Sequence, residues 1–162
     1  MIKTKRTKKY NPNKLAINVN SAFDAINLSK PVSVYSQAKL NEAIHGALEA
    51  ITKGIGEPTH FDVLASTVDI VFMMSINLFQ NAYADEIQQA RQAMFRLKDR
   101  FHAHGVFGFD GEGYQAIKEI IAIHDDVMKN VTGAEMMQFM KARKVAIDNG
   151  NFYRNDMERK AA

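Results

Sequence analysis

The sequence predicts an all-α fold, an antiparallel bundle-like array of about five main helices with a flexible basic N-terminal tail. Apolar residues recur three and four positions apart in five successive segments, which is the period of a helix with one buried face. No segment alternates apolar and polar residues with the period of two that a half-buried strand requires. Short polar or glycine-containing links separate the segments, and such links favour antiparallel neighbours.

The chain has the size and composition of one globular domain, with 162 residues of which 46% are hydrophobic and 24% charged. We divide it into a flexible basic tail over residues 1–13, a single helical domain over 14–150 and a polar C-terminal tail over 151–162. Cysteine is absent, which excludes disulfides, thiolate metal sites and cysteine nucleophiles. The basic N-terminus has no apolar stretch behind it, unlike a secretory signal, so we expect a cytoplasmic protein.

Caps and helix breakers place the first helices. Residues 19–28 are compatible with a short helix that ends before Pro31. A longer helix is predicted over 37–53, with Ser36 as its N-cap and Gly54 in a left-handed C-terminal cap.

The next helix is expected to be the centre of the fold. It follows Pro58, with Thr59 as its N-cap and Asp62 at the third helical position. Residues 70–74 are apolar on every side, which indicates a helix that is buried nearly all round. The uninterrupted apolar part of residues 61–79 is about half of the roughly 20 residues that span a bilayer, so we predict a core helix and no membrane span.

Two more helices are predicted around a glycine-rich loop. A break near residues 81–85 precedes a helix over 85–104, which Gly105 stops. The loop then covers residues 105–113, and a helix over 114–130 follows.

The last helix has the clearest start in the sequence. Thr132 and Glu135 form a capping box, and an apolar series follows it up to the Asn-Gly pair at 149–150. Methionine is frequent in this helix, either filling gaps in the core or forming an adaptable binding surface. A homodimer through the methionine-rich face is therefore one alternative. The apolar series consists of Met136, Phe139, Met140, Val145 and Ile147.

Positive charge is concentrated at the N-terminus. Residues 1–14 contain six basic side chains and no acidic one, which leaves fifteen basic against eighteen acidic residues in the rest of the chain. Such a tail attracts phosphate groups without reading a nucleotide sequence, but it could equally dock on an acidic protein or merely aid solubility. The candidate residues for binding a partner or nucleic acid are Lys3, Lys5, Arg6, Lys8, Lys9, Tyr10 and Lys14.

The histidines are candidates for chemistry, and each also has a structural interpretation. His102 and His104 stand two apart at a helix end, where they complement the helix dipole but do not share a face for chelating a metal. His124, beside two aspartates on an apolar stripe, is either a general base or a half-buried core residue, and we favour the core. Gly46, after His45, interrupts a helix, which favours close approach of another helix over the floor of a pocket. We therefore expect no catalytic residue, metal or cofactor.

The glycine-rich loop carries two phenylalanines, Phe107 and Phe109. It lacks the Gly-Lys-Ser/Thr ending of a phosphate-binding loop, and it follows a helix rather than a strand. Exposed aromatic side chains on a loop are good anchors for a protein partner, while packing back into the core is the alternative. We count both residues as candidates for partner binding.

Short motifs are spread over most of the chain: Lys8-Lys9-Tyr10-x-Pro12, His45-Gly46-Ala47, Thr59 with Asp62, and His124-Asp125. Together they resemble a family of uncharacterised small helical proteins encoded by bacteriophages and plasmids of proteobacteria. The sequence departs from that family over residues 79–91. The resemblance implies no particular activity, but it implies an origin in a mobile element and hence action on host machinery.

These patterns favour binding over catalysis. The first hypothesis is a non-enzymatic, phage-type interaction protein that binds a host protein or protein complex and modulates or inhibits it, for example as an anti-CRISPR protein. The alternative is a nucleic-acid-binding protein that uses the basic tail. An enzyme is the third hypothesis. It ranks below the other two because no arrangement of nucleophile, base and oxyanion donors is visible.

Overall fold

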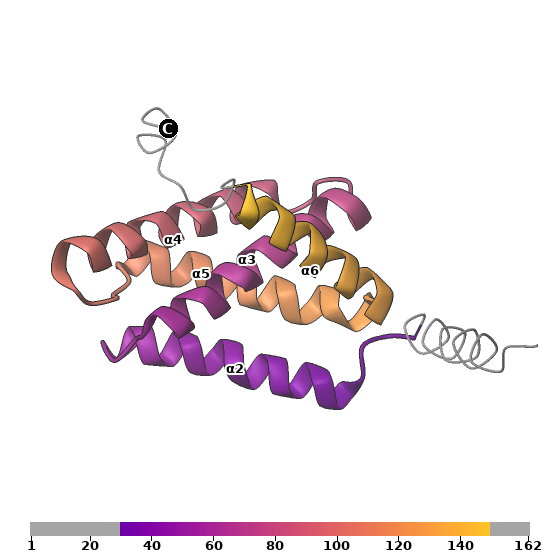
Figure 1. Cartoon of the computed structure of the whole chain (residues 1–162), viewed down its shortest axis with the longest axis horizontal. Coiled ribbons are helices and arrows are strands. Elements are labelled where there is room, and N and C mark those ends of the chain that lie inside the picture. Colours follow the sequence, from indigo (N-terminus) through magenta and orange to yellow (C-terminus); the bar gives the residue numbers. More distant parts are fainter. Residues whose placement is uncertain (1–29, 150–162) are drawn as a thin grey trace, which may run out of the picture.

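The structure, a computed structural model of the chain, describes residues 30–149 (Figure 1). Five α-helices and one short 3₁₀ helix make up most of this range, and no strand occurs within it. The predicted all-α fold is therefore confirmed. The basic tail, the expected short helix over 19–28 and the C-terminal tail lie outside the described residues.

The five main helices fall close to their predicted positions. Their bounds are α2 Val34–Thr52, α3 Pro58–Leu78, α4 Ala84–His104, α5 Gly111–Val127 with the 3₁₀ turn Met128–Asn130, and α6 Gly133–Asp148.

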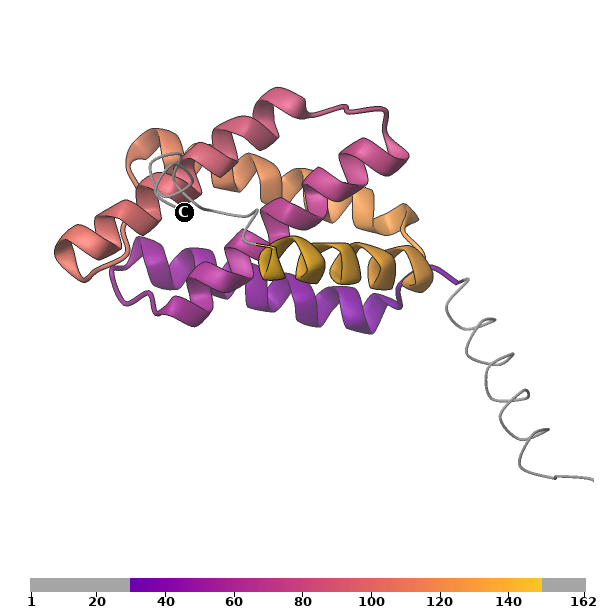
Figure 2. The ribbon, with the colours of Figure 1, turned by 45° about the horizontal axis from the view of Figure 1, so that its top comes forward.

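Helix α3 is the centre of the assembly, as the sequence predicts. It packs against α2, α4, α5 and α6. In Figure 1, α2 lies along the lower edge, α3 crosses the middle diagonally and α6 (yellow) crosses α3 in the right half of the picture; Figure 2 shows the same central place of α3 from a second direction.

Two apolar clusters meet on α3. The larger one joins α2, α3, α4 and α5 and includes Leu64 and Val68 of α3. The smaller one joins α3 to the end of α5 and to Phe139 of α6, and it includes Ile70 and Met74 of α3. Because α3 contributes to both clusters, it has no fully solvated face along its middle turns.

Among residues 30–149, α3 alone is long and apolar enough to cross a membrane by length and composition, with a mean hydropathy of 1.5 over its most apolar window. Half of that window is buried inside the protein. The core helix of a soluble protein passes the same test, and the contacts of α3 with four other helices account for its apolar character.

The predicted N-cap of α2 is wrong by one turn. Ser33, not Ser36, is the N-cap, and its hydroxyl accepts a hydrogen bond from the backbone N–H of Ser36 at 3.2 Å. Both serines satisfy the preference for a short hydroxyl side chain at this position, so the sequence pattern fits either start.

The predicted N-cap of α3 is also wrong. The helix begins at Pro58, with Glu57 as its N-cap instead of Thr59. The Nδ1 atom of His60 accepts a hydrogen bond from the backbone N–H of Glu57 at 2.9 Å. Proline suits the first position of a helix because its fixed φ is already helical and its missing N–H would have no partner there.

The break between α3 and α4 is confirmed, and it turns through left-handed residues. Gln80, Asn81 and Tyr83 have φ of 51°, 63° and 65°. Ser75 holds this turn, because its hydroxyl donates to the carbonyl of Ala82 and its carbonyl accepts from the N–H of Asn81 at 2.8 Å. These contacts stabilise a backbone conformation that is costly for residues with a Cβ.

Helix α5 begins three residues earlier than predicted. Asp110 is its N-cap, and the carboxylate accepts a hydrogen bond from the backbone N–H of Gly113 at 2.6 Å. A carboxylate at a helix N-terminus is favoured by both the hydrogen bond and the helix dipole, which outweighs the low helix propensity of glycine. The glycine-rich loop is therefore shorter than predicted and covers residues 105–110.

The expectation that another helix approaches Gly46 is wrong. This residue lies on the exposed side of α2, and a Cβ atom built on it would have no neighbour within 4 Å. No packing within the described residues therefore accounts for a glycine inside this helix.

Two contacts attach the start of α6. The predicted capping box is confirmed: the hydroxyl of Thr132 accepts from the N–H of Glu135 at 3.2 Å, and the Glu135 carboxylate accepts from the N–H of Thr132 at 2.8 Å. The carbonyl of Val131 accepts from the N–H of Val32 at 3.1 Å, which ties the segment before α2 to the segment before α6.

A buried ion pair attaches the other half of α6. The carboxylate of Asp69 in α3 is 1% exposed, and its Oδ2 accepts a hydrogen bond from Nε of Arg143 at 2.9 Å. The α6 helix therefore has a fixed rotation about its own axis, with Arg143 directed toward α3.

Replacing Gly46 by alanine is expected to raise the free energy of unfolding by about 0.5–1 kcal/mol, because alanine loses less backbone entropy in a helix. The matched control is Gly105→Ala, since a Cβ there also meets nothing within 4 Å but φ is +74°. That substitution should lower the stability by about 1 kcal/mol or more. Urea unfolding of both variants measures the effect, and a change of the same sign in both would contradict it.

Replacing Arg143 by methionine is expected to lower the free energy of unfolding by about 3 kcal/mol, because it leaves the Asp69 carboxylate buried without its guanidinium partner. Lys144→Met is the control, because the Lys144–Asp148 pair has a similar length of 3.0 Å but both side chains are exposed. The control should change the stability by about 0.5 kcal/mol or less. Equal losses in the two variants would show that the buried pair does not fix α6.

Candidate interaction surface

The candidate residues of the basic tail lie outside the described residues, so their role in binding a partner or nucleic acid stays a prediction. These residues are Lys3, Lys5, Arg6, Lys8, Lys9, Tyr10 and Lys14.

Phe107 is a core residue, so its expected role as an exposed anchor is wrong. It is 5% exposed, and its ring stacks on Phe101 with centroids 4.1 Å apart and on Phe61 at 5.6 Å. Phe109 is half-buried and packs against the same cluster. The alternative in which the loop phenylalanines pack back into the core is the one that the structure shows.

Charged contacts hold this loop closed over the core. Arg100 donates from Nη1 to the carbonyl of Gly108 at 2.5 Å, and Nε of Arg96 donates to Oδ2 of Asp110 at 3.1 Å. The backbone N–H of Gly113 chiefly, together with the two guanidinium groups, lowers the pKa of the Asp110 carboxyl. The carboxylate therefore stays charged and keeps both arginines in place at neutral pH.

His102 and His104 lie in the last turn of α4, as predicted, where imidazoles complement the helix dipole. Within residues 30–149, no group of three or more histidine, aspartate or glutamate side chains is placed to hold a metal ion.

A polar array joins α2 to α5, and the sequence identified two of its members. Asp125 lies at its centre: Oδ1 is 3.2 Å from Nδ1 of the buried His124, and Oδ2 is 3.5 Å from Nε2 of the exposed His45. When the side-chain amide of Asn41 is oriented so that both of its ends are satisfied, its nitrogen donates to Oδ1 of Asp125 at 3.2 Å. The carboxylate therefore links α5 to α2.

His124 is the core histidine that we favoured, because its side chain is fully buried. A carboxylate accepts hydrogen bonds, so the ring carries its proton on Nδ1, and Nε2 has no hydrogen-bond partner among the described residues. Burial is the main cause that lowers the pKa of His124, and the neighbouring Asp125 carboxylate partly opposes it. The ring is therefore neutral at pH 7.

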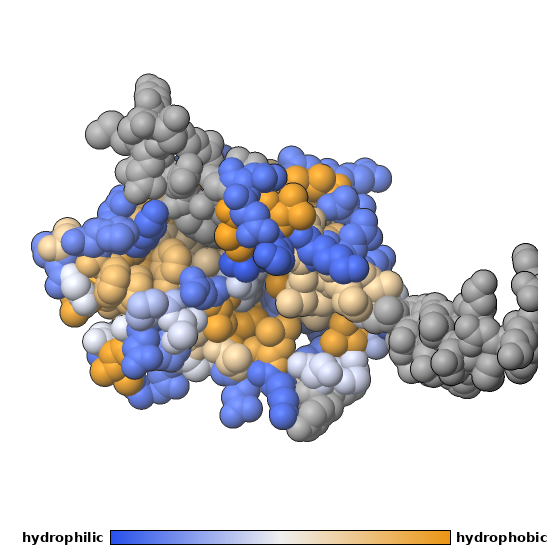
Figure 3. Space-filling view, in the orientation of Figure 1, coloured by the Kyte–Doolittle hydropathy of each residue, from blue (hydrophilic) through white to orange (hydrophobic). Residues whose placement is uncertain are grey.

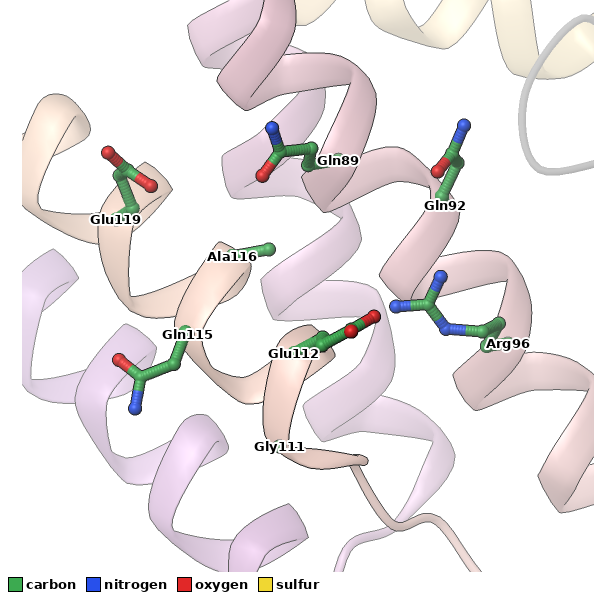
Figure 4. Close-up of a pocket in the computed structure, with 8 residues that line it drawn as sticks. All are labelled: Gln89, Gln92, Arg96, Gly111, Glu112, Gln115, Ala116 and Glu119. Carbon is green, nitrogen blue, oxygen red and sulfur yellow. The ribbon is translucent and has the colours of Figure 1, made fainter.

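An open groove of about 500 Å³ lies between α4 and α5 (Figure 4). Figure 4 shows Glu112 directed toward Arg96, whereas Gln115 and Glu119 point away from α4. Amide and carboxylate groups of this kind form hydrogen bonds with water or a polar ligand, and no residue proposed from the sequence lines the groove. The lining residues are Gln89, Gln92, Arg96, Gly111, Glu112, Gln115, Ala116 and Glu119.

The largest share of exposed apolar side chains belongs to α6. Four of the nine large apolar side chains that are exposed within residues 30–149 lie on this helix, which makes it the main candidate for protein contact. They are Met137 at 43% exposure, Met140 at 58%, Val145 at 58% and Ile147 at 44%. Figure 3 shows orange and tan atoms along α6 with blue atoms between them.

Two parallel seams run along α6, and three of these side chains, Met137, Met140 and Ile147, lie in one of them, whereas Val145 lies in neither. The inner seam faces α3 and consists of Met136, Phe139, Arg143 and Ala146. The outer seam is shifted by one residue, or about 100° around the helix, and faces solvent. It consists of Met137, Met140, Lys144 and Ile147.

Sequence reasoning identified α6 as an apolar helix but not which of its residues face outward. Both seams have the same spacing of three, four and three residues, so periodicity alone does not separate them. Charge does not separate them either, because Arg143 and Lys144 occupy the same place in the two seams; the contact of Arg143 with Asp69 identifies the inner seam only in the folded structure.

Lowering the pH from about 7.5 to 5 is expected to reduce the stability, because the unfolded His124 binds a proton near pH 6.5 whereas the folded residue resists it. The loss begins as the pH falls through about 6.5 and continues down to the lowered pKa of the folded state. Urea unfolding across this range should give a steeper dependence for the wild type than for His124→Gln. The exposed His104→Gln retains His124 and should retain the slope. An unchanged slope in His124→Gln would contradict this assignment.

No family model, curated protein or solved structure matched the chain, so the resemblance to helical proteins of phages and plasmids stays a prediction.

Proposed function

We propose that this chain is a non-enzymatic interaction protein that binds a host protein or protein complex through the outer seam of α6 and modulates or inhibits it. The observation that carries the proposal is the exposure of Met137, Met140 and Ile147 on one stripe of a helix whose rotation is fixed. Exposed apolar patches that are surrounded by polar residues often mark interaction sites on soluble proteins. Methionine suits such a site because its flexible side chain adapts to different partners.

The resemblance to proteins of phages and plasmids supports a partner in the host cell. An anti-defence role, such as anti-CRISPR activity, is the form of inhibition that we propose first. Blocking a host complex requires a stable, exposed surface and no reaction chemistry, which fits the seam of a rigidly attached helix.

A second candidate function, binding of nucleic acid, rests on the basic tail. Six basic and no acidic side chains within residues 1–14 form a strong attraction for phosphate groups. The remainder of the chain has more acidic than basic residues, so this affinity would come from the tail and would fall steeply with salt.

Capture of partners from a host lysate, after nuclease treatment, tests the proposal. Met140→Glu places a charge in the outer seam and is expected to remove the captured protein. Val145→Glu is the matched control, since Val145 is equally exposed at 58% but lies about 140° around the helix from Met140. The control should keep its partner.

The nuclease treatment separates the two functions. A partner that disappears after nuclease and after deletion of residues 1–13, but not in Met140→Glu, would favour binding of nucleic acid through the tail. A partner kept equally by both glutamate variants would contradict the proposed surface.

A further inference from the structure

We infer that the partner of the outer seam is an amphipathic α-helix with acidic side chains beside its apolar stripe. This inference rests on the proposed function, because it names the chemistry of the segment that the seam would bind. It is carried by the spacing of the seam and by the charges on and next to it.

The spacing of the outer seam selects a helix. Met137, Met140, Lys144 and Ile147 are three, four and three residues apart, which is the alternation of the two core positions in a coiled coil. The seam extends for about 15 Å along α6, enough for a partner helix to place three successive layers of side chains against it. An extended peptide has a repeat of two residues and would not match these positions.

The charges of α6 select an acidic partner. Lys144 lies within the seam, and its Nζ is 3.0 Å from Oδ2 of Asp148 on the same helix. Lys141 flanks the seam and has no carboxylate within ion-pair distance among residues 30–149. Arg143, the third basic residue of α6, is bound to Asp69 on the inner side. Positive charge beside the seam is thus available to a carboxylate of the partner, in the flanking position where coiled coils form interhelical ion pairs.

A second copy of the chain fits the seam less well. Two parallel copies would place Lys144 opposite Lys144 in one layer, and like charges in that position are unfavourable. In an antiparallel pair that aligns Met137 with Ile147, Lys144 would face Met140 of the other copy. In both arrangements the carboxylate beside the seam, that of Asp148, already binds Lys144 of the same helix. A different chain that supplies new carboxylates satisfies Lys141 better.

The test uses the full-length protein and three synthetic peptides of equal length. One is an amphipathic helix with leucine in its apolar stripe and glutamate in the flanking positions, the second carries lysine in those positions, and the third is a scrambled acidic sequence. The scrambled peptide measures the attraction of acidic peptides to the basic tail. Fluorescence anisotropy should show that the acidic helix binds about tenfold more tightly than either of the other peptides.

Variants of α6 assign the binding to the seam. Met140→Glu and Lys141→Glu should each weaken the acidic helix about tenfold. Val145→Glu adds the same charge outside the seam and should weaken it by about twofold or less. Lys141→Glu should also improve binding of the lysine-flanked peptide. All three side chains concerned are exposed, and thermal unfolding monitored by circular dichroism confirms that each variant is folded.

Several results would overturn the inference. Equal binding of the acidic helix and its scrambled form, or equal losses in Met140→Glu and Val145→Glu, would show that the seam does not recognise an acidic helix. A dimer in light scattering that Met140→Glu dissociates would show that a second copy fills the seam. If the lysate partner is lost in Met140→Glu while the acidic helix does not bind, the proposed function stands and this inference fails. If the acidic helix binds the seam but no host protein does, this inference about the seam stands and the proposed function fails.

Discussion

The fold depends on the burial of α3, which packs against α2, α4, α5 and α6 and contributes apolar side chains to both clusters. Burial of an apolar helix releases the most free energy when every side of the helix is removed from water. The packing of the other helices around α3 meets this requirement. Asp69 is the polar exception on this helix, and its cost is offset by Arg143 from α6. The buried charge in the central helix is therefore one of the contacts that place α6.

That attachment decides which side of α6 is exposed to solvent. Phe139 and Arg143 hold the inner seam of α6 against α3, while the capping box and the bridge to Val32 hold its start. Because the rotation of α6 about its axis is fixed, the outer seam, which is shifted by one residue from the inner seam, faces solvent along its whole length. A binding surface on a rigid helix loses little entropy when a partner docks, which favours recognition without a change of shape.

The remaining polar features serve the interior of the bundle. Asp125 of α5 contacts His45 and Asn41 of α2, and it also contacts its neighbour His124, whose burial lowers the pKa of the imidazole. Asp110 caps α5 and binds Arg96 and Arg100 of the preceding helix, which closes the loop over Phe107. The groove between α4 and α5 is lined mostly by amide and charged groups, so water molecules can form the hydrogen bonds of these groups without a ligand.

The sequence by itself determined the all-α class, the five helices, the central place of α3 and the capping box of α6, because periodicity and capping chemistry act over a few neighbouring residues. Tertiary structure decided the features that depend on distant residues. Phe107 is buried because Phe61 and Phe101 pack against it, and Gly46 is exposed because nothing within residues 30–149 lies within 4 Å of a Cβ built on it. The two seams of α6 have identical spacing, and the contact of Arg143 with a charge 74 positions away decides which of them is exposed.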